Sequence, residues 1–263
     1  MINVSVSIVC YKNDKKELVQ TINSVLNSNG INTYLYIIDN SPTNYLRCLS
    51  NQSNIEYVWT NKNIGFGAGH NIAIRKSIEA GFRYHLVLNP DIYFDSNVLS
   101  SIVKYMDLSN VSLLMPKIIN PDGSIRKVRR RLPTPLVIFG RFVLPSFLFQ
   151  RIECRYRTED MDYNVICSAP FLSGCFMFFR TSELKRLGGF DERYFMYFED
   201  ADLSRRFYQN SKTVYFPNVS VVHLAHRESH KSIKLMRIHL HSAILYFNKW
   251  GWLFDSFRKS ANK

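Results

Sequence analysis

The sequence has few cysteines, and none of them is spaced like a metal ligand. The five cysteines form no Cys-x-x-Cys pair and no zinc-ligand pattern, so a zinc centre is not expected. Their odd number and apolar settings are typical of reduced thiols in a cytoplasmic protein. The N-terminal residues also lack the basic flank and apolar stretch of a signal peptide, which agrees with a cytoplasmic location.

Long uncharged hydrophobic runs, internal repeats and low-complexity linkers are absent as well. The stretch closest to a membrane span, residues 133–149, is interrupted by Arg141 and Pro145, so we expect no transmembrane helix. The chain has 263 residues, of which 46% are hydrophobic. This content predicts an ordered α/β domain with a small appendage rather than a disordered chain.

Acidic residues are far outnumbered by basic ones in the second half of the chain. The formal net charge is +13. Residues 1–115 carry 9 Lys or Arg against 8 Asp or Glu, whereas residues 116–263 carry 25 against 13. Such asymmetry predicts an anionic partner for the second half, namely a membrane surface, a phosphate-rich substrate or nucleic acid.

The hydrophobic pattern predicts strands that alternate with helices. Strands are expected at residues 4–10, 34–39, 55–60, 85–88, 111–115, 171–179 and 213–223. Helices are expected at residues 14–28, after a Gly-rich loop at 65–69 through about 79, and at 96–106, 182–188, 200–209 and 231–250. Residues 151–162 look like a charged loop. This alternation predicts an α/β fold with a mostly parallel sheet and helices on both faces.

Polar residues collect where the predicted strands end. Tyr11 follows the first strand, Asp39 and Asn40 the second, Asn61 the third and Asp91 the fourth. Ligands of open α/β sheets bind at the carboxyl ends of the strands. The pattern therefore predicts a binding cleft along one edge of the sheet.

The segment Asn89-Pro90-Asp91 has two interpretations. A hard divalent cation takes oxygen ligands, usually one or two carboxylates plus substrate phosphates, and Asp91 facing a nucleotide diphosphate would suit that role. Asn-Pro-Asp is also good turn chemistry. His223, at the end of a later predicted strand, is likewise either a structural histidine or a ligand for a metal or phosphate.

The segment Glu199-Asp200-Ala201-Asp202 follows an aromatic stretch at residues 194–198. Acidic residues at such a position cap a helix and favour its dipole, and we expect this of at least one of the three. Carboxylates beside an apolar wall also make a general base site, because such walls shift carboxylate pKa values. The two roles are compatible when different residues carry them.

The loop at residues 65–69 contains Gly65, Gly67 and Gly69. Its spacing fits neither phosphate-binding fingerprint, so both are rejected. Its glycines either let the backbone approach a ligand or form a plain turn.

Together these motifs resemble glycosyltransferase family 2, the nucleotide-diphospho-sugar transferases of GT-A fold. Within it they are most similar to the bacterial rhamnosyltransferase-like branch of O-antigen and cell-wall polysaccharide assembly. The resemblance runs in order from residue 4 to about residue 226. It rests on residues 7–11, 37–41, 61–71, 88–91, 171–177, 188–192 and 194–203.

The resemblance implies a role for each matching position. Asp39 would recognise the base of the donor nucleotide, and the loop from Asn63 to Asn71 would lie against the donor. The positions so assigned to the donor are Ser7, Val9, Tyr11, Asp39, Asn63, Gly65, Gly69, Asn71 and Asn89. The segments containing Gly174 and Asp191 are assigned to the acceptor.

A metal and a base are implied in the same way. Asp91 matches the last residue of the DXD metal motif, which binds Mg²⁺ or Mn²⁺, and His223 matches a further ligand of some relatives. Asn89 stands where the motif has its first Asp, a variation of the rhamnosyltransferase-like branch that leaves fewer charged ligands. Asp200, with Glu199 beside it, matches the catalytic base.

The implied activity is inverting transfer of a sugar from a nucleotide-sugar donor to a glycan or a polyprenyl-diphosphate-linked acceptor. L-Rhamnose from dTDP-rhamnose is the first expectation, and a UDP-hexose or UDP-galactofuranose donor is the alternative. A nucleic-acid-binding module is disfavoured, because the aromatic residues lie in apolar runs and no recognised module fits. Intact Asp91, Glu199 and Asp200 argue against an inactive scaffold.

The expected organisation is a GT-A domain at residues 1–225 and a basic helical extension at residues 226–263. The domain divides into a nucleotide-sugar half, 1–115, and an acceptor and catalytic half, 116–225. We expect the protein to rest on the inner face of the plasma membrane, where a lipid-linked acceptor would be found. The basic run 126–131, the apolar stretch 136–149 and the basic C-terminal helix favour this. Alternatively, the apolar stretch packs on the domain and the basic residues bind acceptor phosphates.

Overall fold

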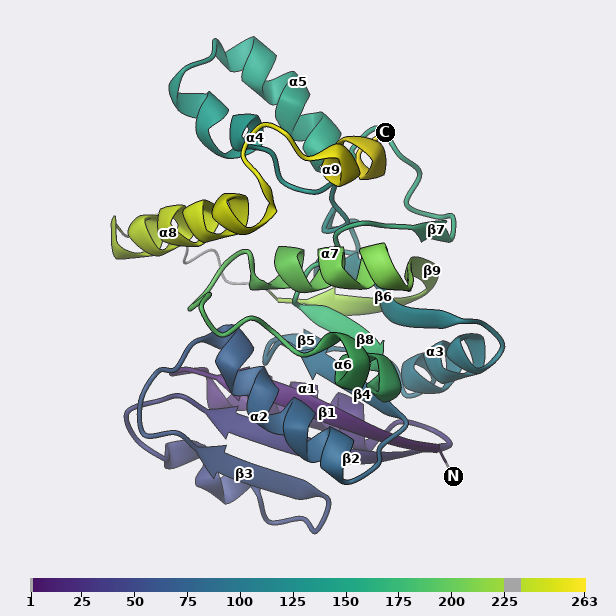
Figure 1. Cartoon of the computed structure of the whole chain (residues 1–263). Coiled ribbons are helices and arrows are strands. Elements are labelled where there is room, and N and C mark those ends of the chain that lie inside the picture. The colour runs from purple at the N-terminus through teal and green to yellow at the C-terminus, as the bar shows by residue number, and fades with distance from the viewer. Residues whose placement is uncertain (1, 225–232) are drawn as a thin grey trace.

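The computed structural model describes residues 2–224 and 233–263 (Figure 1). One mixed sheet organises the chain, with the strand order β3-β2-β1-β4-β8-β6-β9-β5 and with β7 beside β9. The strands are β1 (Ile2–Cys10), β2 (Ile31–Asp39), β3 (Ile55–Trp59), β4 (Tyr84–Leu88), β5 (Ile92–Tyr93), β6 (Val111–Ile119), β7 (Cys167–Ser168), β8 (Phe176–Arg180) and β9 (Lys212–His223).

The sheet has four parallel and four antiparallel strand pairs, and the parallel pairs that the sequence predicts include the longest strands. β1 pairs in parallel with β2 and β4, β2 with β3, and β6 with β9. β8 lies antiparallel between β4 and β6, and the short β5 and β7 are antiparallel to β9. The expected strand at 171–179 begins later, at Phe176, because the residues before it contact α7 (Glu199–Asn210) instead: the N–H of Leu172 donates to Ser204 and that of Gly174 to Asp200.

Helices cover both faces of this sheet (Figure 1). They are α1 (Lys15–Leu26), α2 (Phe66–Glu79), α3 (Val98–Asp107), α6 (Thr181–Leu187) and α7 (Glu199–Asn210). On β1, Val6 and Ile8 join the core cluster that contains Leu18 of α1. Ser7, which points the opposite way along the strand, contacts α2 instead through His70.

Helix α1 begins where the sequence predicts. The Asp14 side chain accepts hydrogen bonds from the backbone N–H groups of Lys16 and Glu17, at 2.7 and 3.2 Å. Such an N-cap satisfies donors that have no partner inside the helix and contributes about 1 kcal/mol.

The Gly-rich segment differs from the expected loop, because α2 already begins at Phe66. A Cβ on Gly67 would lie 2.7 Å from Cβ of Phe190, and one on Gly69 would lie 2.8 Å from Cγ2 of Val9. These two glycines therefore lie inside the helix and let it pack closely on β1 and on the loop at Phe190. Gly65, at φ +96°, caps the helix, and a Cβ there would lie 2.4 Å from the carbonyl oxygen of Phe195.

A second helical layer lies above α7 in the view of Figure 1. It comprises α4 (Pro135–Phe139), α5 (Ser146–Tyr156), α8 (Ile233–Trp250) and α9 (Ser256–Ala261). Its own apolar cluster joins Phe171 and Phe198 to Tyr246 and Phe247 of α8. The prediction of a loop at 151–162 was wrong over its first half, because α5 continues to Tyr156. Its charged residues Arg151 and Arg155 face solvent, so the charge that suggested a loop marks one side of a helix.

The start expected for the C-terminal helix at Lys231 and the domain boundary expected at residue 225 lie outside the described residues. None of the described helices is long and apolar enough to cross a membrane.

Candidate functional site

Asp39 lies at the carboxyl end of β2 and is fully buried. Its Oδ2 accepts a hydrogen bond of 2.7 Å from the hydroxyl of Tyr57, and its Oδ1 accepts one of 2.9 Å from the N–H of Ser41. Burial and the hydrogen bond to Asp39 raise the pKa of Tyr57, so its hydroxyl stays protonated and donates. Asp39 is thus held rigidly at the strand end, next to the exposed Tyr11.

Several of the residues assigned to the donor make their polar contacts within the protein. The Ser7 hydroxyl lies 2.7 Å from Nδ1 of His70 and 3.0 Å from Nε2 of His85, in the buried layer between β1 and α2. Burial lowers the pKa of His70 and lowers that of His85 to about 3, so both rings are neutral. The Ser7 side chain therefore makes its hydrogen bonds inside the protein. Asn63 does the same, because its Oδ1 accepts the N–H of Gly65 at 3.0 Å.

Asn71, another residue assigned to the donor, also makes its hydrogen bonds within the protein. Its side-chain amide donates to the carbonyl of Phe190 at 2.8 Å and to Glu192 at 2.9 Å, and its Oδ1 accepts the N–H of Phe190. A Cβ on Gly189 would lie 2.3 Å from this Oδ1. Asn71 thereby fixes the loop that contains Asp191 against α2.

Asp91 and His223 are brought together from distant parts of the chain. Ile92 of β5 pairs with His223 at the end of β9, and His223 Nε2 lies 3.2 Å from Asp91 Oδ1. Burial lowers the pKa of His223, but hydrogen bonds to Asp91 and Cys175 outweigh it and raise that pKa to about 9. Asn89 is beside them, since its N–H donates to the carbonyl of Cys175 at 2.9 Å.

Whether this pair fits a divalent cation depends on its donor atoms. A carboxylate oxygen lies beside an imidazole nitrogen that must lose its proton before it can bind a metal, and this set suits Mn²⁺, while Mg²⁺ accepts it through the oxygen. Within residues 2–224 and 233–263, no group of three or more His, Cys, Asp or Glu side chains forms a metal site. The pair therefore fits a cation that takes its remaining ligands from phosphate and water.

Glu199 and Asp200 begin α7 and lie on the wall of a cavity of about 770 Å³. Asp200 Oδ2 accepts the N–H of Gly174 at 2.9 Å, and Oδ1 accepts that of Ala201 at 2.9 Å. Burial raises the pKa of Asp200, although these hydrogen bonds and Arg130 oppose it. Asp200 thus remains the more acidic of the two and can act as a base.

Glu199 has a different environment although it is the neighbouring residue. Burial and the charge of Asp200 raise its pKa well above the ordinary value. Its Oε2 is buried without a hydrogen-bond partner in the described part of the chain, which would be costly for an ionised carboxylate. Glu199 therefore holds its proton more tightly than Asp200 and is the poorer candidate for the base.

The backbone before these carboxylates is strained. Tyr197 and Phe198 have φ of 69° and 66°, a region that costs non-glycine residues energy and that clusters at functional sites. Packing of Phe198 on Tyr246, with ring centroids 5.5 Å apart, helps to hold this conformation. The absence of a side chain at Gly174 lets Asp200 and the Phe66 ring lie close to its backbone, since a Cβ there would lie 3.2 Å from Cβ of Asp200 and 3.3 Å from the Phe66 ring.

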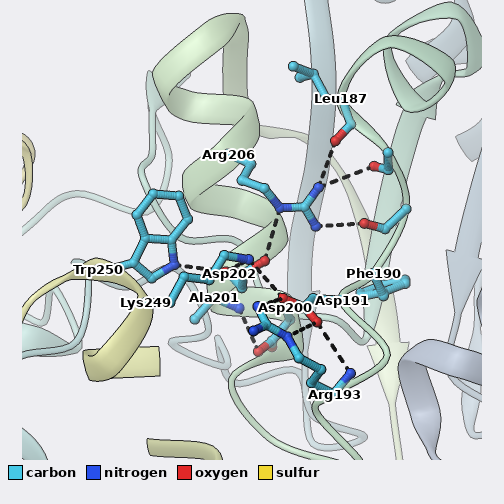
Figure 2. Close-up of polar contacts among 12 residues, drawn as sticks. Leu187, Phe190, Asp191, Arg193, Asp200, Ala201, Asp202, Arg206, Lys249 and Trp250 are labelled. Carbon is cyan, nitrogen blue, oxygen red and sulfur yellow. Dashed lines mark hydrogen bonds and ion pairs between the residues drawn. The ribbon is translucent and has the colours of Figure 1, made fainter. Parts of the chain in front are cut away.

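Asp202 and Asp191 face a cluster of cations, as Figure 2 shows. Asp202 is fully buried, and its carboxylate contacts Lys249 Nζ at 2.7 Å, Trp250 Nε1 at 2.8 Å and Arg206 Nε at 2.9 Å. Lys249 also contacts Asp191 at 2.9 Å. Hydrogen bonds from Arg193 and Lys249 hold the pKa of Asp191 well below its usual range, despite opposition from burial. Asp191 is therefore tied to α8 rather than open to an acceptor.

Residues 5–188 match the sequence pattern described as Glycosyl transferase family 2. The chain belongs to glycosyltransferase family 2. Asp39, Asp91 and Gly174 of this glycosyltransferase lie inside the matched span, whereas Asp200 and His223 follow it.

Curated relatives in this family carry sugar-transferase names. Rhamnosyltransferase WbbL of Escherichia coli (strain K12) is 29% identical over 194 residues, 69% of each chain. The N-acetylglucosaminyl-diphospho-decaprenol L-rhamnosyltransferase of Mycobacterium tuberculosis (strain ATCC 25618 / H37Rv) is 30% identical over 182 residues, 65% of this chain and 59% of the relative. The low-salt glycan biosynthesis hexosyltransferase Agl10 of Haloferax volcanii is 26% identical, over 78% of this chain and 61% of the relative.

Solved structures establish the GT-A fold. The crystal structure of S. aureus TarS has a TM-score of 0.62 at 16% identity, over 99% of this chain and 42% of TarS. That of GalNAc-T7 with UDP, GalNAc and Mn²⁺ has a TM-score of 0.62 at 15% identity, over 86% of this chain and 44% of that one. At such identities the likeness shows the fold alone, and the GT-A transferase fold expected from the sequence is confirmed.

Sequence reasoning missed the roles of the basic residues in this glycosyltransferase. The run 126–131 was expected to bind a membrane surface or acceptor phosphates, but Arg129 is buried with its guanidinium 4.5 Å from the Tyr163 ring centre. Arg131 is buried too and donates to the carbonyl of Asn262. Lys249 and Trp250 lie 47 or more residues after Asp202, so no local signal connects them to the site.

Proposed function

We propose that this glycosyltransferase is an inverting enzyme that transfers L-rhamnose from dTDP-rhamnose to a lipid-linked or glycan acceptor in bacterial surface polysaccharide synthesis. The names of the two rhamnosyltransferase relatives support the sugar, and the second of them names a diphospho-decaprenol acceptor. The observation that carries the mechanism is the position of Asp200, between Gly174 on the sheet side and the cavity on the helical side.

The proposed reaction is a single in-line displacement. Asp200 takes the proton of the acceptor hydroxyl, and the acceptor oxygen forms a bond to the anomeric carbon of the donor sugar. The bond from that carbon to the diphosphate oxygen breaks on the opposite face, and its electron pair leaves with the nucleoside diphosphate. One displacement inverts the anomeric centre. Positioned base catalysis contributes roughly 10²–10⁴-fold.

In this proposal Asp39 binds the donor base, and Asp91 with His223 would hold Mg²⁺ or Mn²⁺. A bound divalent cation neutralises charge on the leaving diphosphate. Asn89 leaves Asp91 as the single carboxylate of this motif. We expect Asp91→Ala to abolish turnover without loss of the fold, and excess chelator to do the same to the wild type. Full activity in chelator would contradict the metal role.

The donor is tested by thermal unfolding with a panel of dTDP-, UDP- and GDP-sugars. A ligand present at 100 times its Kd adds about 2.7 kcal/mol of stability, so the true donor should raise the melting temperature most. We expect dTDP-rhamnose to do so. A larger shift with a UDP-hexose or UDP-galactofuranose would replace the donor and leave the mechanism in place.

We also propose that the protein is cytoplasmic and binds the inner face of the plasma membrane as a peripheral protein. Apolar residues are exposed at the tip between α4 and α5, at Val143 and Phe147, and in the loop before α9, where Phe254 is 97% exposed. Basic residues near an anionic leaflet contribute about 1 kcal/mol each. The protein should float with anionic liposomes at low salt, less so at high salt, and not with neutral ones. Failure to bind anionic liposomes at low salt would refute this.

A further inference from the structure

The cavity next to Asp200 has two kinds of wall. It lies between α4 and α5 on one side and α8 on the other, and the first turn of α7 closes it. Val137, Ile138 and Leu240 contribute aliphatic surface, and Arg130, Arg141 and Arg157 contribute cations. A site for a neutral glycan alone needs neither the long aliphatic wall nor the arginines.

Three acidic side chains, those of Glu153, Glu199 and Asp200, also line this cavity. Glu153 pairs with Arg157 at 2.5 Å, so these two charges balance each other. Burial and the charge of Asp200 raise the pKa of Glu199 well above its usual range, so Asp200 is the more acidic of these two neighbours. Burial and then the charges of Arg141 and Arg130 lower the pKa of His239 on the same wall, so this histidine adds no charge and reports a positive potential.

Arg130 is the cation closest to the chemistry. Its guanidinium lies 5.8 Å from the ring centres of both Tyr156 and Phe171, which fix its position. Its charge acts on Asp200 and on Tyr156. Its Nε is buried without a hydrogen-bond partner among the described residues, and an unsatisfied buried donor of this kind is costly. A positioned, desolvated guanidinium is well suited to bind a phosphate.

We propose that this cavity binds the phosphate or diphosphate of a lipid-linked acceptor at Arg130, with the adjoining hydrocarbon along Val137, Ile138 and Leu240. The inference rests on the proposed function and names the residues that bind the lipid-linked acceptor at the same site. The acceptor sugar lies between the phosphate and Asp200, so Arg130 places the hydroxyl at the base. The aliphatic wall gains burial free energy only from an acceptor that carries a hydrocarbon chain.

The binding test uses farnesyl diphosphate as a probe, with dTDP and chelator present to occupy or disable the donor site. Calorimetry should show binding to the wild type and about tenfold weaker binding to Arg130→Gln, which corresponds to about 1.4 kcal/mol. Arg151→Gln removes the same charge from an exposed position of α5 and should bind like the wild type. Equal binding by the wild type and Arg130→Gln would overturn the proposal.

Two further probes separate the hydrocarbon from the anion. Inorganic pyrophosphate and farnesol should each bind more weakly than farnesyl diphosphate, since each lacks one of the two contacts. Val137→Thr keeps the shape of the side chain and should weaken farnesyl diphosphate several-fold without affecting pyrophosphate. If pyrophosphate binds as well as farnesyl diphosphate, the cavity is an anion site and the lipid assignment is wrong.

Turnover separates this inference from the proposed function. With dTDP-rhamnose, Arg130→Gln should raise KM for a prenyl-diphosphate-linked sugar far more than for the same sugar as a neutral methyl glycoside. Equal effects on both acceptors would overturn the role of Arg130 while leaving the transferase activity established. Absence of transfer to either acceptor from every donor, together with intact farnesyl diphosphate binding, would refute the proposed function and leave the cavity assignment standing.

Discussion

The two sides of the first turn of α7 carry similar acids in opposite environments. On the cavity side, burial raises the pKa values of Glu199 and Asp200. On the other side, Asp202 contacts Lys249 and Arg206 at under 3 Å and is fully buried. In the proposed mechanism Asp200 supplies the chemistry, whereas Asp202, whose charge is balanced by cations, supplies structure. A cluster of carboxylates is therefore understood only when the cations around each one are known.

Helical geometry creates this division. Successive residues of an α-helix are rotated by about 100°, so Asp200 and Asp202 point to nearly opposite sides. The cations come from elsewhere in the chain, since Arg206 lies one turn further along α7 and Lys249 lies at the end of α8. Arg205 joins α7 to the start of α9 as well, through an ion pair of 2.6 Å with Asp255 in which both side chains are 3% exposed.

Of the two sides of this turn, the cavity side should show the larger effect on turnover. Asp200→Asn should lower kcat by roughly 10²–10⁴-fold, because an amide cannot accept the proton, while donor binding stays nearly unchanged. Thermal unfolding should show no loss of stability. Steady-state kinetics with a donor titration measures this. A greater loss in Glu199→Gln would move the base to Glu199, and activity in both variants would refute the mechanism.

On the opposite side of the turn, substitution of Asp202 should change the stability of the protein more than its turnover. Asp202→Asn should lower the free energy of unfolding by about 1.5–3 kcal/mol, because it weakens charge-assisted hydrogen bonds. Its kcat should fall far less than that of Asp200→Asn. Urea unfolding measures this, with Lys249→Met and the double variant as the matched cycle. The two changes should be less than additive, because they share one interaction. Unchanged stability in Asp202→Asn would contradict the structural role.

The pH profile of kcat should report the environment of Asp200. Its pKa is raised by burial, so activity should fall on acidification at a pH above the ordinary aspartate value of about 3.9. Arg130 opposes this rise, and Arg130→Gln should shift the acid limb to higher pH. Arg151→Gln is the control and should leave the limb in place. An acid limb that Arg130→Gln does not move would contradict the electrostatic role of Arg130.

The smallest effect is expected for Glu199→Gln. A raised folded-state pKa means that the folded state holds the proton more tightly. The resulting stability is present below the unfolded pKa of about 4.3 and is lost as pH rises through the folded pKa. The glutamine side chain does not titrate, so the variant has no such loss of stability as pH rises. It should match the wild type near pH 4, become relatively more stable toward pH 8, and keep kcat within a few-fold. Thermal unfolding across pH measures this, and a wild type that gains on the variant as pH rises would contradict it.

Local sequence signals predicted the elements around the donor side well. Three of these signals depend only on neighbouring residues, and each feature lies where expected: the alternation in β1, the Asp14 cap and the polar residues at the ends of β2 and β4. The roles of Ser7 and Asn71 were not predictable in this way. Their partners, His70 and Phe190, lie 63 and 119 residues away, and the choice between a ligand and an internal partner depends on packing.

The amino-acid sequence by itself determined the α/β class, the parallel strand ends and the family, because these follow from local periodicity and an ordered set of motifs. Only the tertiary structure decided which acids face cations, which arginines are buried, and that α4, α5 and α8 enclose a cavity beside Asp200. The physical reason is that pKa values and binding depend on burial and on charges a few ångströms away. In this chain those charges come from residues as far apart as Asp202 and Lys249.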